Sequence, residues 1–231
     1  SPASQRGRDF GIMLRTFYDL GYNVEWRVIN AAEYGCAQKR RRTFIFAWKR
    51  NLNYNAISQN TPFQIMYNVG LFARNYPIEN NAIKNNNVNQ DIDLTIYTDT
   101  VEMTEKFKTP FYNTGVMING IVNTFDSFPI VEPFISMREV RENRAGLNEY
   151  FLTDIQREKF EILRGSKKIL RTKPNGETYY YSEGSMAFPD SLDLPGRTML
   201  TSEASINRST HVIEDEETGN LRFITPVEAE R

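Results

Sequence analysis

Three polar side chains with the chemistry to hold an anion alternate along one short stretch of the sequence. Gln38, Arg40 and Arg42 are separated by one residue each, and Lys39 and Arg41 complete a run of four cations. In an extended backbone, side chains two residues apart point to the same face. A planar amide and two guanidinium groups on one face suit a substrate that carries phosphates and base-edge carbonyl oxygens. We expect Lys39 and Arg41 to be exposed to solvent.

Two apolar runs flank this stretch and predict the strands that position it. Residues 24–29 and 43–48 are rich in β-branched and aromatic residues, which is typical of strands. Before them, residues 9–20 repeat apolar side chains at helical spacing, and Gly21 suits the end of that helix. A helix with one hairpin is marginal alone, so we expect it to pack against a further part of the chain.

The basic stretch resembles a motif of the DNA cytosine-5 methyltransferases. The pattern Asn-Ala-x-x-Tyr-Gly followed by Gln-x-Arg-x-Arg spans Asn30 to Arg42, and only Cys36 and Ala37 depart from the aliphatic residue and proline of that family. The segment from Arg222 to Arg231 resembles a second family motif, Arg-x-Leu-Thr-Pro-x-Glu-x-x-Arg, with Ile in place of Leu. The two ordered motifs bracket nearly the whole chain.

The resemblance implies a reaction and roles for three residues. The family transfers a methyl group from S-adenosylmethionine to C5 of a flipped cytosine, after a cysteine thiolate attacks C6 and an acidic residue assists at N3. Arg42 matches the arginine that reaches O2 of the cytosine, and Arg40 matches its partner, which fixes the active site. Gln38 is the third member, with a mainly structural role.

The other catalytic parts of the family do not occur in the sequence. It has no Pro-Cys motif, no Glu-Asn-Val motif and no Phe-x-Gly-x-Gly loop for S-adenosylmethionine. We assign Cys36 to packing, or to no particular role, rather than to nucleophilic attack. His211 is assigned a structural role, and no metal site is predicted. Since the chain starts in a polar loop without Met and stops within a helical run, we expect a fragment that lacks its N-terminal catalytic half and is inactive alone.

By resemblance, the chain divides into three functional parts. Residues 1–50 are the end of a Rossmann-like catalytic domain, residues 51–221 are a β-rich target recognition domain that reads double-stranded DNA, and residues 222–231 start a junction helix. The predicted fold class is therefore α+β, with a helix and β-hairpin joined to the recognition domain. Arg222, Glu228 and Arg231 are expected to brace the junction.

Candidate DNA-binding residues fall in two places of the predicted recognition domain. Residues 164–173 hold five cations and no acid, and among them we assign Lys167, Lys168 and Arg171 to phosphate contacts. Residues 197–201 resemble a Thr-Leu element near the end of such domains, and residues 202–209 suit a loop that approaches bases. The candidates there are Thr198, Ser202, Asn207 and Arg208, the last suited to guanine.

Composition excludes several classes of protein. Hydrophobic residues make up 40% and charged residues 25%, which fits a globular protein, and no run of 18 apolar residues or signal peptide is present. A single cysteine fits a reducing cytoplasm, and the family resemblance implies a bacterial or phage-encoded protein. The net charge of −1 argues against a uniformly basic surface, but residues 1–50 hold ten Lys or Arg against four acids. Such local charge can direct a polyanion into a groove.

Two other functions remain open from the sequence. The chain can be a stand-alone, non-catalytic DNA-binding module, or a fragment of an enzyme that methylates cytosine in RNA. Pro-Cys and Glu-Asn-Val motifs upstream would separate an enzyme from the binding module. The length of the predicted recognition domain favours a DNA reader over an RNA enzyme.

Local signals predict the remaining elements. Residues 51–60 read as a connection, residues 61–78 as weakly helical, residues 80–90 with six asparagines as a mobile loop, and residues 92–101 as a strand. Hairpin turns are expected at Asn119-Gly120 and Asn175-Gly176. Helices are expected to start at Thr153, with Gln156 in a capping box, and at Thr225-Pro226.

Overall fold

The chain forms two compact units. The computed structural model describes residue 2 and residues 4–52, 59–142 and 146–231. Unit 1 comprises Ser1–Tyr34 and Arg41–Glu132, and unit 2 comprises Gly35–Arg40 and Pro133–Arg231. Both units mix helices and strands, which confirms the α+β class at that level. Within the described ranges, no helix has the length and apolar content that a membrane crossing requires.

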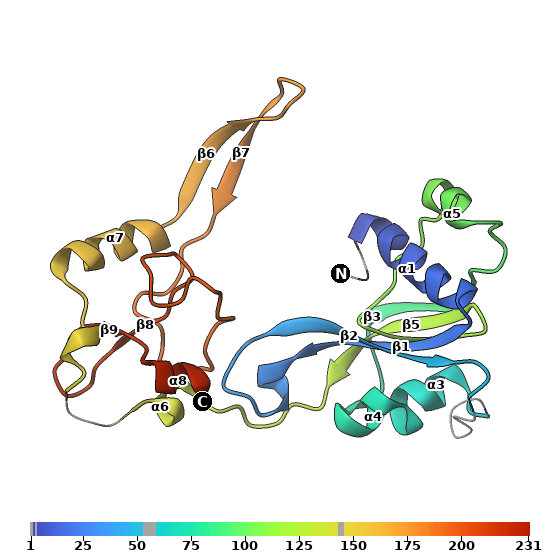
Figure 1. Cartoon of the computed structure of the whole chain (residues 1–231), viewed down its shortest axis with the longest axis horizontal. Coiled ribbons are helices and arrows are strands. Elements are labelled where there is room, and N and C mark those ends of the chain that lie inside the picture. The colour runs from blue at the N-terminus through green and yellow to red at the C-terminus, as the bar shows by residue number, and fades with distance from the viewer. Residues whose placement is uncertain (1, 3, 53–58, 143–145) are drawn as a thin grey trace. The chain divides into compact units, whose positions relative to one another are not determined.

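Unit 1 is built on a five-stranded antiparallel sheet in the order β2-β1-β4-β5-β3 (Figure 1). The strands are β1 (Tyr22–Asn30), β2 (Arg41–Lys49), β3 (Ile78–Asp93), β4 (Thr114–Ile118) and β5 (Ile121–Pro129). The predicted hairpin β1–β2 is confirmed. Because β1 also pairs with β4, the hairpin packs into one sheet with a later part of the chain, as expected.

Helices cover both faces of this sheet (Figure 1). On one face lie α1 (Arg8–Asp19) and α5 (Thr100–Lys106), and α1 is the N-terminal helix predicted from the sequence. On the other face lie α3 (Pro62–Gln64), the π-helical turn η3 (Ile65–Val69) and α4 (Leu71–Asn75). Side chains alternate between the layers, as the pleat of a strand requires. Met117 of β4 packs with Phe10 and Trp26, whereas its neighbour Val116 packs with Ile65.

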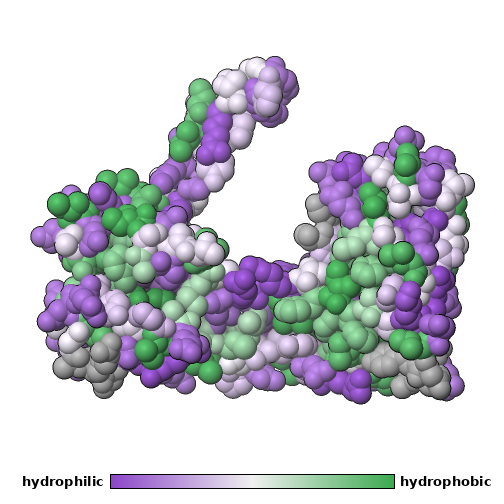
Figure 2. Space-filling model, in the orientation of Figure 1, coloured by the Kyte–Doolittle hydropathy of each residue, from purple (hydrophilic) through white to green (hydrophobic). Residues whose placement is uncertain are grey.

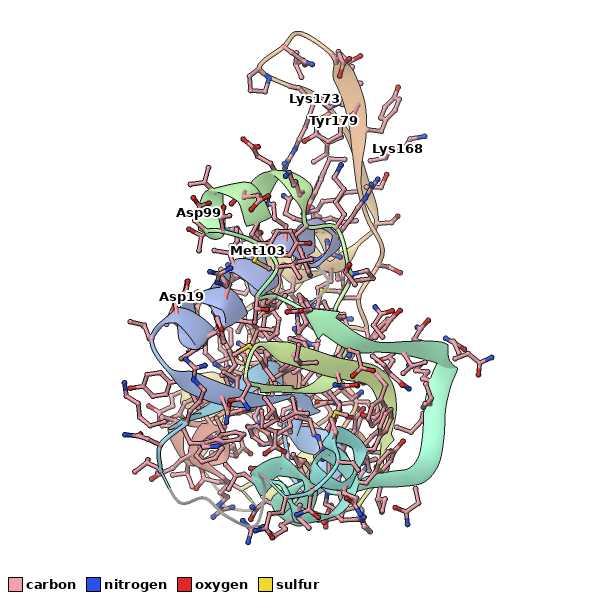
Figure 3. The ribbon with its side chains drawn as sticks, turned by 90° about the vertical axis from the view of Figure 1, so that its right-hand side faces the viewer. Asp19, Asp99, Met103, Lys168, Lys173 and Tyr179 are labelled. Atoms are coloured by element: carbon pink, nitrogen blue, oxygen red, sulfur yellow. The ribbon has the colours of Figure 1, made fainter. Side chains whose placement is uncertain are left out.

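The two helices of the first face are in close contact. Gly11 of α1 faces α5, because a Cβ added there would lie 2.7 Å from Cε of Met103. Figure 3 labels Met103, whose side chain points from α5 toward α1. Gly11 therefore permits the close approach of these helices.

Two buried charges of β1 hold the opposite helical layer. Glu25 accepts hydrogen bonds from the backbone N–H groups of Leu71 (2.9 Å) and Phe72 (3.2 Å) at the start of α4. Arg27 donates to the carbonyl oxygens of Phe72 (3.1 Å) and Met66 (2.5 Å). Burial raises the pKa of Glu25, although the charge of Arg27 and both N–H groups oppose the shift. The strand thus supplies partners for helix-end groups that lack one within the helix.

The asparagine-rich stretch is a strand, and the predicted loop over residues 80–90 is wrong. These residues lie within β3, which pairs with β5 at the edge of the sheet with several register shifts. Asn85, Asn86 and Asp91 have positive φ angles of 54°, 55° and 51°. Asn and Asp tolerate this conformation better than other non-glycine residues. The asparagines therefore allow irregularities in an edge strand rather than breaking it.

The predictions for the segments on either side of residues 80–90 have different outcomes. The strand predicted over residues 92–101 is wrong, because β3 ends at Asp93 and α5 begins at Thr100. The helical reading of residues 61–78 is confirmed by α3, η3 and α4. Of the connection predicted over residues 51–60, residues 53–58 lie outside the described ranges.

Unit 2 is assembled from short elements around a small apolar core. Its helices are α6 (Met137–Val140), α7 (Asp154–Arg164) and α8 (Pro226–Glu230), with a 3₁₀ turn over Asn148–Tyr150. The strands β8 (Val212–Glu214) and β9 (Leu221–Phe223) form an antiparallel pair. The core consists of Met137, Val140, Leu192, Ile213 and Ile224. The capping box predicted at Thr153 and the helix start predicted at Thr225-Pro226 are both present, and Thr225 also forms a capping box with Glu228.

A separate hairpin extends from the end of α7 (Figure 1). It consists of β6 (Lys167–Thr172) and β7 (Thr178–Glu183), paired antiparallel around the predicted Asn175-Gly176 turn. Every residue from 168 to 180 is exposed.

The compact units differ from the three functional parts expected from the sequence. Residues 59–132 pack with the β1–β2 hairpin in unit 1 rather than with residues 133–231. The sequence boundary after residue 50 rests on the family resemblance, which does not reveal the pairing of β1 with β4. The division into catalytic and recognition parts concerns function and stays a prediction.

Candidate nucleic-acid interface

The motif segment 35–40 is bonded to the predicted Thr-Leu element within unit 2. Gln38 forms a parallel bridge with Gly196. The N–H of Lys39 donates to the carbonyl oxygen of Gly196, and the N–H of Gly196 donates to that of Ala37, both at 2.7 Å. The hydroxyl of Thr198 donates to the carbonyl oxygen of Lys39 at 2.6 Å, across 159 residues of sequence. Two segments singled out from the sequence are therefore neighbours in the fold.

This pairing leaves Arg40 at the surface and Gln38 beside a cavity. Arg40 is exposed, and its Nη1 donates to the carbonyl oxygen of Met199 at 3.4 Å. Gln38 is half-buried and lines a cavity of about 260 Å³ together with Cys36 and His211. The fold of unit 2 thus holds the backbone of the motif and presents one of its guanidinium groups to solvent.

Close approach of the two segments depends on Gly196. A Cβ added there would lie 3.0 Å from Sδ of Met137 and 3.4 Å from the carbonyl oxygen of Ala37. The segment carrying Gln38 therefore lies where a larger residue at 196 would crowd it.

Arg42 belongs to unit 1. It is the second residue of β2, lies opposite Ile29 and is exposed. Its Nη1 donates to the carbonyl oxygen of Arg41 at 2.8 Å. Both arginines line a cavity of about 740 Å³ in unit 1, which Asn87 and Asp126 also border. Since Gln38 and Arg40 belong to unit 2, the expectation that the three side chains share one face stays a prediction.

A largely buried carboxylate, whose side chain is 10% exposed, anchors the Thr-Leu element from its other side. Asp190 accepts hydrogen bonds from Arg197 (2.8 and 3.2 Å), from Arg164 (2.8 Å) and from the N–H of Val212 (2.9 Å). Burial alone would raise the pKa of Asp190, but these donors together hold it below its usual value. The backbone beside Thr198 is therefore held by a charge network as well as by residues 37–39.

The final motif forms a buried ion pair. Both Nη atoms of Arg222 donate to the carboxylate of Glu228 at 2.7 Å. Glu228 also accepts the N–H of Thr225 (2.8 Å) and that of Glu142 (2.7 Å). Burial acts to raise the pKa of Glu228, and the bonds from Arg222 and the two N–H groups outweigh it and lower that pKa. Arg231 donates to the carbonyl oxygen of Val140 at 3.2 Å, so these residues brace unit 2 internally.

The predicted phosphate contacts lie on the exposed β6–β7 hairpin. Lys168 and Arg171 are exposed, and Lys167 at the root is half-buried. Nζ of Lys168 lies 4.6 Å from the ring centre of Tyr180, and Cζ of Arg171 lies 3.9 Å from that of Tyr181. The hairpin therefore presents cations beside aromatic rings.

The predicted base-reading loop over residues 202–209 is folded on itself. The carbonyl oxygen of Ser202 accepts the hydroxyl of Thr210 at 3.2 Å, and Oδ1 of Asn207 accepts the N–H of Ser209 at 2.9 Å. Ser202 is half-buried and Asn207 is exposed. The role of this loop at bases stays a prediction.

Arg208 makes contacts that the sequence did not indicate. Its Nη1 donates to Oε2 of Glu183 (2.7 Å) and to the carbonyl oxygen of Leu163 (3.2 Å), and its Nη2 donates to that of Gly184. These groups lie where α7 ends and β7 ends, so Arg208 ties the root of the hairpin to the rest of unit 2. Pairing with guanine would require these bonds to break. The partners lie 24–45 residues away in sequence, so no local signal points to them.

The two side chains assigned non-catalytic roles differ in their surroundings. His211 is buried, and its Nδ1 lies 3.0 Å from Oε2 of Glu203. The other carboxylate oxygen of Glu203, Oε1, accepts the backbone N–H of His211 at 2.6 Å. That arrangement suits a structural role. Cys36 is exposed, so its side chain is not buried as a packing role would require. Among the described residues, no group of three or more His, Cys, Asp or Glu could hold a metal ion.

Comparisons with known proteins agree with the motifs. Residues 3–231 match the family described as C-5 cytosine-specific DNA methylase. The chain is 50% identical over its whole length to the Type II methyltransferase M.Sau3AI of Staphylococcus aureus and covers 55% of that protein. It is 25% identical over 199 residues to the Type II methylase M.HgiEI of Herpetosiphon aurantiacus, across 74% of this chain and 43% of the relative. A 45-residue stretch is 44% identical to M.MthTI of Methanothermobacter thermautotrophicus.

The matches cover this chain more fully than they cover the relatives. The chain spans about half the length of the first of these relatives. No solved structure matches it. The family match nevertheless covers nearly all of its residues, and the chain belongs to the C-5 cytosine-specific DNA methylase family.

Proposed function

We propose that this chain is the DNA-contacting part of a DNA cytosine-5 methyltransferase of the restriction-modification type. The whole protein then transfers a methyl group from S-adenosylmethionine to C5 of a cytosine in double-stranded DNA, in the cytoplasm of a bacterium or from a phage gene. One observation carries the proposal. The Gln-x-Arg segment at residues 38–40 is bonded to Gly196 and to Thr198 of the Thr-Leu element, the latter across 159 residues of sequence.

The proposal assigns roles to the polar side chains of the first motif and to the cations of the β6–β7 hairpin. Arg42 contacts O2 of the target cytosine, where a cation stabilises the charge that develops during attack on the ring. Arg40 supports that site, and Gln38 holds the motif backbone. Lys167, Lys168 and Arg171 contact phosphates, since solvent-exposed cations release counterions when they bind DNA.

In this proposal the nucleophile and the methyl-donor site lie outside these 231 residues. The residues present do not fit S-adenosylmethionine. Gly7, which precedes the long helix α1, faces the carbonyl oxygen of Thr109, which a Cβ at Gly7 would meet at 2.1 Å. This helix start is therefore filled by the chain itself.

The functional division predicted from the sequence becomes part of the proposal. Helix α1 with the β1–β2 hairpin belongs to a Rossmann-like catalytic domain, residues 51–221 form the target recognition domain, and residues 222–231 begin the junction to the following helix. The buried pair of Arg222 and Glu228 supports a bracing role for the last segment.

The test measures transfer of labelled methyl groups to duplex DNA by the whole gene product. Arg42→Gln is expected to lower kcat at least a hundredfold, on the scale of a lost oxyanion-type donor. The matched control is Arg41→Gln, because Arg41 is a neighbouring exposed cation. A gene product without any activity on DNA would contradict the proposal and favour a stand-alone binding module, whereas transfer to RNA alone would favour an RNA enzyme.

A further inference from the structure

Both faces of the β6–β7 hairpin are exposed. Cross-strand pairs such as Ile169 with Tyr181 and Leu170 with Tyr180 define its faces, because directly opposed residues point the same way. The first face carries Lys167, Ile169, Arg171, Tyr179 and Tyr181, and the second carries Lys168, Leu170, Thr172, Thr178 and Tyr180.

Large apolar side chains stand on each face. On the first face Ile169 is 45% exposed and Tyr179 40%, and on the second Leu170 is 57% exposed and Tyr180 61%. Figure 2 shows hydrophobic and hydrophilic residues side by side along this hairpin. A two-stranded hairpin with no packed face is at best marginally stable in water. The arrangement therefore suits a partner that encloses the ribbon on both sides.

Cations also stand on both faces. Arg171 stacks on Tyr181 on the first face, and Lys168 lies over Tyr180 on the second. Figure 3 shows the labelled side chains of the hairpin directed to different sides of the ribbon. Such stacking restricts long side chains before binding and so reduces the entropy that binding costs.

The acidic side chains of the hairpin are already paired. Glu177 accepts from Lys173 at 2.8 Å, and Glu183 accepts from Arg208 at 2.7 Å. Because these carboxylates are neutralised within the chain, the faces of the ribbon are left with net positive charge. The partner that complements them is a polyanion.

We propose that this hairpin enters the major groove of duplex DNA, with each face toward one phosphate wall and the turn at residues 173–177 toward the base edges. The proposal rests on the proposed function and names the element that enters the DNA. A major groove about 12 Å wide admits a two-stranded ribbon, whereas a minor groove about 6 Å wide does not. Its two walls both carry phosphates, which matches cations on both faces.

The root of the ribbon is built to keep its direction. Arg208 bonds Glu183 and Gly184 at the end of β7 and Leu163 at the end of α7. The N–H of Met186 donates to the carbonyl oxygen of Arg164 at 2.8 Å and closes the same root. An element that enters a groove must be held at a defined angle by its scaffold.

The first test measures binding of the 231-residue chain to a fluorescent duplex as salt is varied. Lys168→Gln and Arg171→Gln are each expected to weaken binding on the order of tenfold and to lower the slope of log Kd against log salt by about 1. The double variant lowers it by about 2. Lys159→Gln is the control, since Lys159 is an exposed cation on α7 of the same unit. Circular dichroism checks that each variant is folded.

Two results of this test would overturn the proposal. In the first, the hairpin variants have the same affinity and salt slope as Lys159→Gln. In the second, the chain does not bind duplex DNA at any salt concentration. Either result would also count against the phosphate contacts assigned to Lys168 and Arg171. The proposed reaction is tested separately, by methyl transfer from the whole gene product, and can hold when the hairpin proposal fails.

The second test distinguishes the groove and the type of partner. Methyl green, a major-groove ligand, is expected to displace the chain, and netropsin, a minor-groove ligand, is not. Leu170→Ser is expected to weaken binding without changing the salt slope, because it removes no charge. Displacement by netropsin alone overturns the major-groove assignment. Unchanged DNA binding by Leu170→Ser, together with loss of a dimer in sedimentation, shows instead that the faces cover a second copy of the chain.

Discussion

Two hairpins of this chain share an Asn-Gly signal at the turn, but one is buried in a sheet and the other is exposed to solvent. The β4–β5 hairpin turns at Asn119-Gly120, and its residues Val116, Met117 and Val122 are fully buried in the sheet of unit 1. The β6–β7 hairpin turns at Asn175-Gly176 and is exposed along both strands. The dipeptide therefore predicts where the chain reverses, and the flanking side chains determine what surrounds the strands.

Even the turns differ in detail. Asn119 and Gly120 have φ angles of 50° and 84°, as a two-residue hairpin turn requires. In the second hairpin only Gly176 has a positive φ, of 86°, and the N–H of Lys173 donates to the carbonyl oxygen of Glu177 at 2.8 Å. The exposed turn is longer, and no buried sheet constrains it.

The largest expected effect is in the buried hairpin. A Cβ at Gly115 would lie 2.0 Å from Cζ2 of Trp26, whose Nε1 is fixed by a 3.0 Å bond to the carbonyl oxygen of Tyr112. We expect Gly115→Ala to lower the free energy of unfolding by about 3 kcal/mol, as overpacking of a buried site does. Urea unfolding followed by tryptophan fluorescence measures it, because Trp26 and Trp48 both belong to unit 1.

The control for this change lies beside the exposed hairpin. Gly184 has no heavy atom within 4 Å of an added Cβ and no positive φ. Gly184→Ala is expected to change the free energy of unfolding by less than about 0.5 kcal/mol. Equal losses in the two variants would contradict the view that packing separates the hairpins.

The turn glycines test the same contrast at smaller scale. Both have positive φ, so alanine at either position is strained by about 1 kcal/mol. At Gly120 an added Cβ would also lie 2.5 Å from Cγ2 of Thr95 and 3.0 Å from the ring of Tyr18, whereas at Gly176 it meets nothing within 4 Å. We expect Gly120→Ala to cost about 2 kcal/mol and Gly176→Ala about 1 kcal/mol. Urea unfolding of unit 1 and hydrogen exchange of the β6–β7 amides measure the two costs.

The sequence predicted both hairpins because their signals are local. The prediction for residues 80–90 was wrong. Six asparagines indicate a polar loop, but an edge strand buries few of its residues and can therefore be polar. The sequence also assigned Arg208 to guanine, because a lone arginine in a polar segment carries no sign of its partners. Those partners, from Leu163 to Gly184, come together only when α7 and the hairpin fold.

The bonds of Arg208 test what holds the exposed hairpin in place. Arg208→Met keeps an unbranched apolar stem and removes the bonds of the guanidinium group to Glu183 and Gly184. If these bonds set the direction of the ribbon, affinity for duplex DNA falls on the order of tenfold, which corresponds to about 1.4 kcal/mol. The matched control is Arg157→Met, because Arg157 is an exposed arginine of α7.

A role at the root is separable from direct contact of Arg208 with DNA. A direct contact predicts that Arg208→Met weakens binding equally in the wild-type and the Lys168→Gln, Arg171→Gln backgrounds. If Arg208 positions the hairpin, Arg208→Met is expected to weaken binding less in the Lys168→Gln, Arg171→Gln background. A misdirected hairpin that has already lost these two DNA contacts loses less binding energy. Equal effects in both backgrounds would count against the positioning role.

The smallest expected effect is a loosening of the same root at acid pH. The hydrogen bond from Tyr181 and the charge of Arg208 hold the pKa of Glu183 below its ordinary value of 4.5. A carboxylate with a lowered folded pKa adds stability above its unfolded pKa and loses it as pH falls through the folded value. The amide signals of Gly165 and Gly184 are therefore expected to shift below about pH 4.5 in an NMR titration. Arg208→Met moves that transition to higher pH, and an unchanged midpoint would show that Arg208 and Glu183 do not interact in solution.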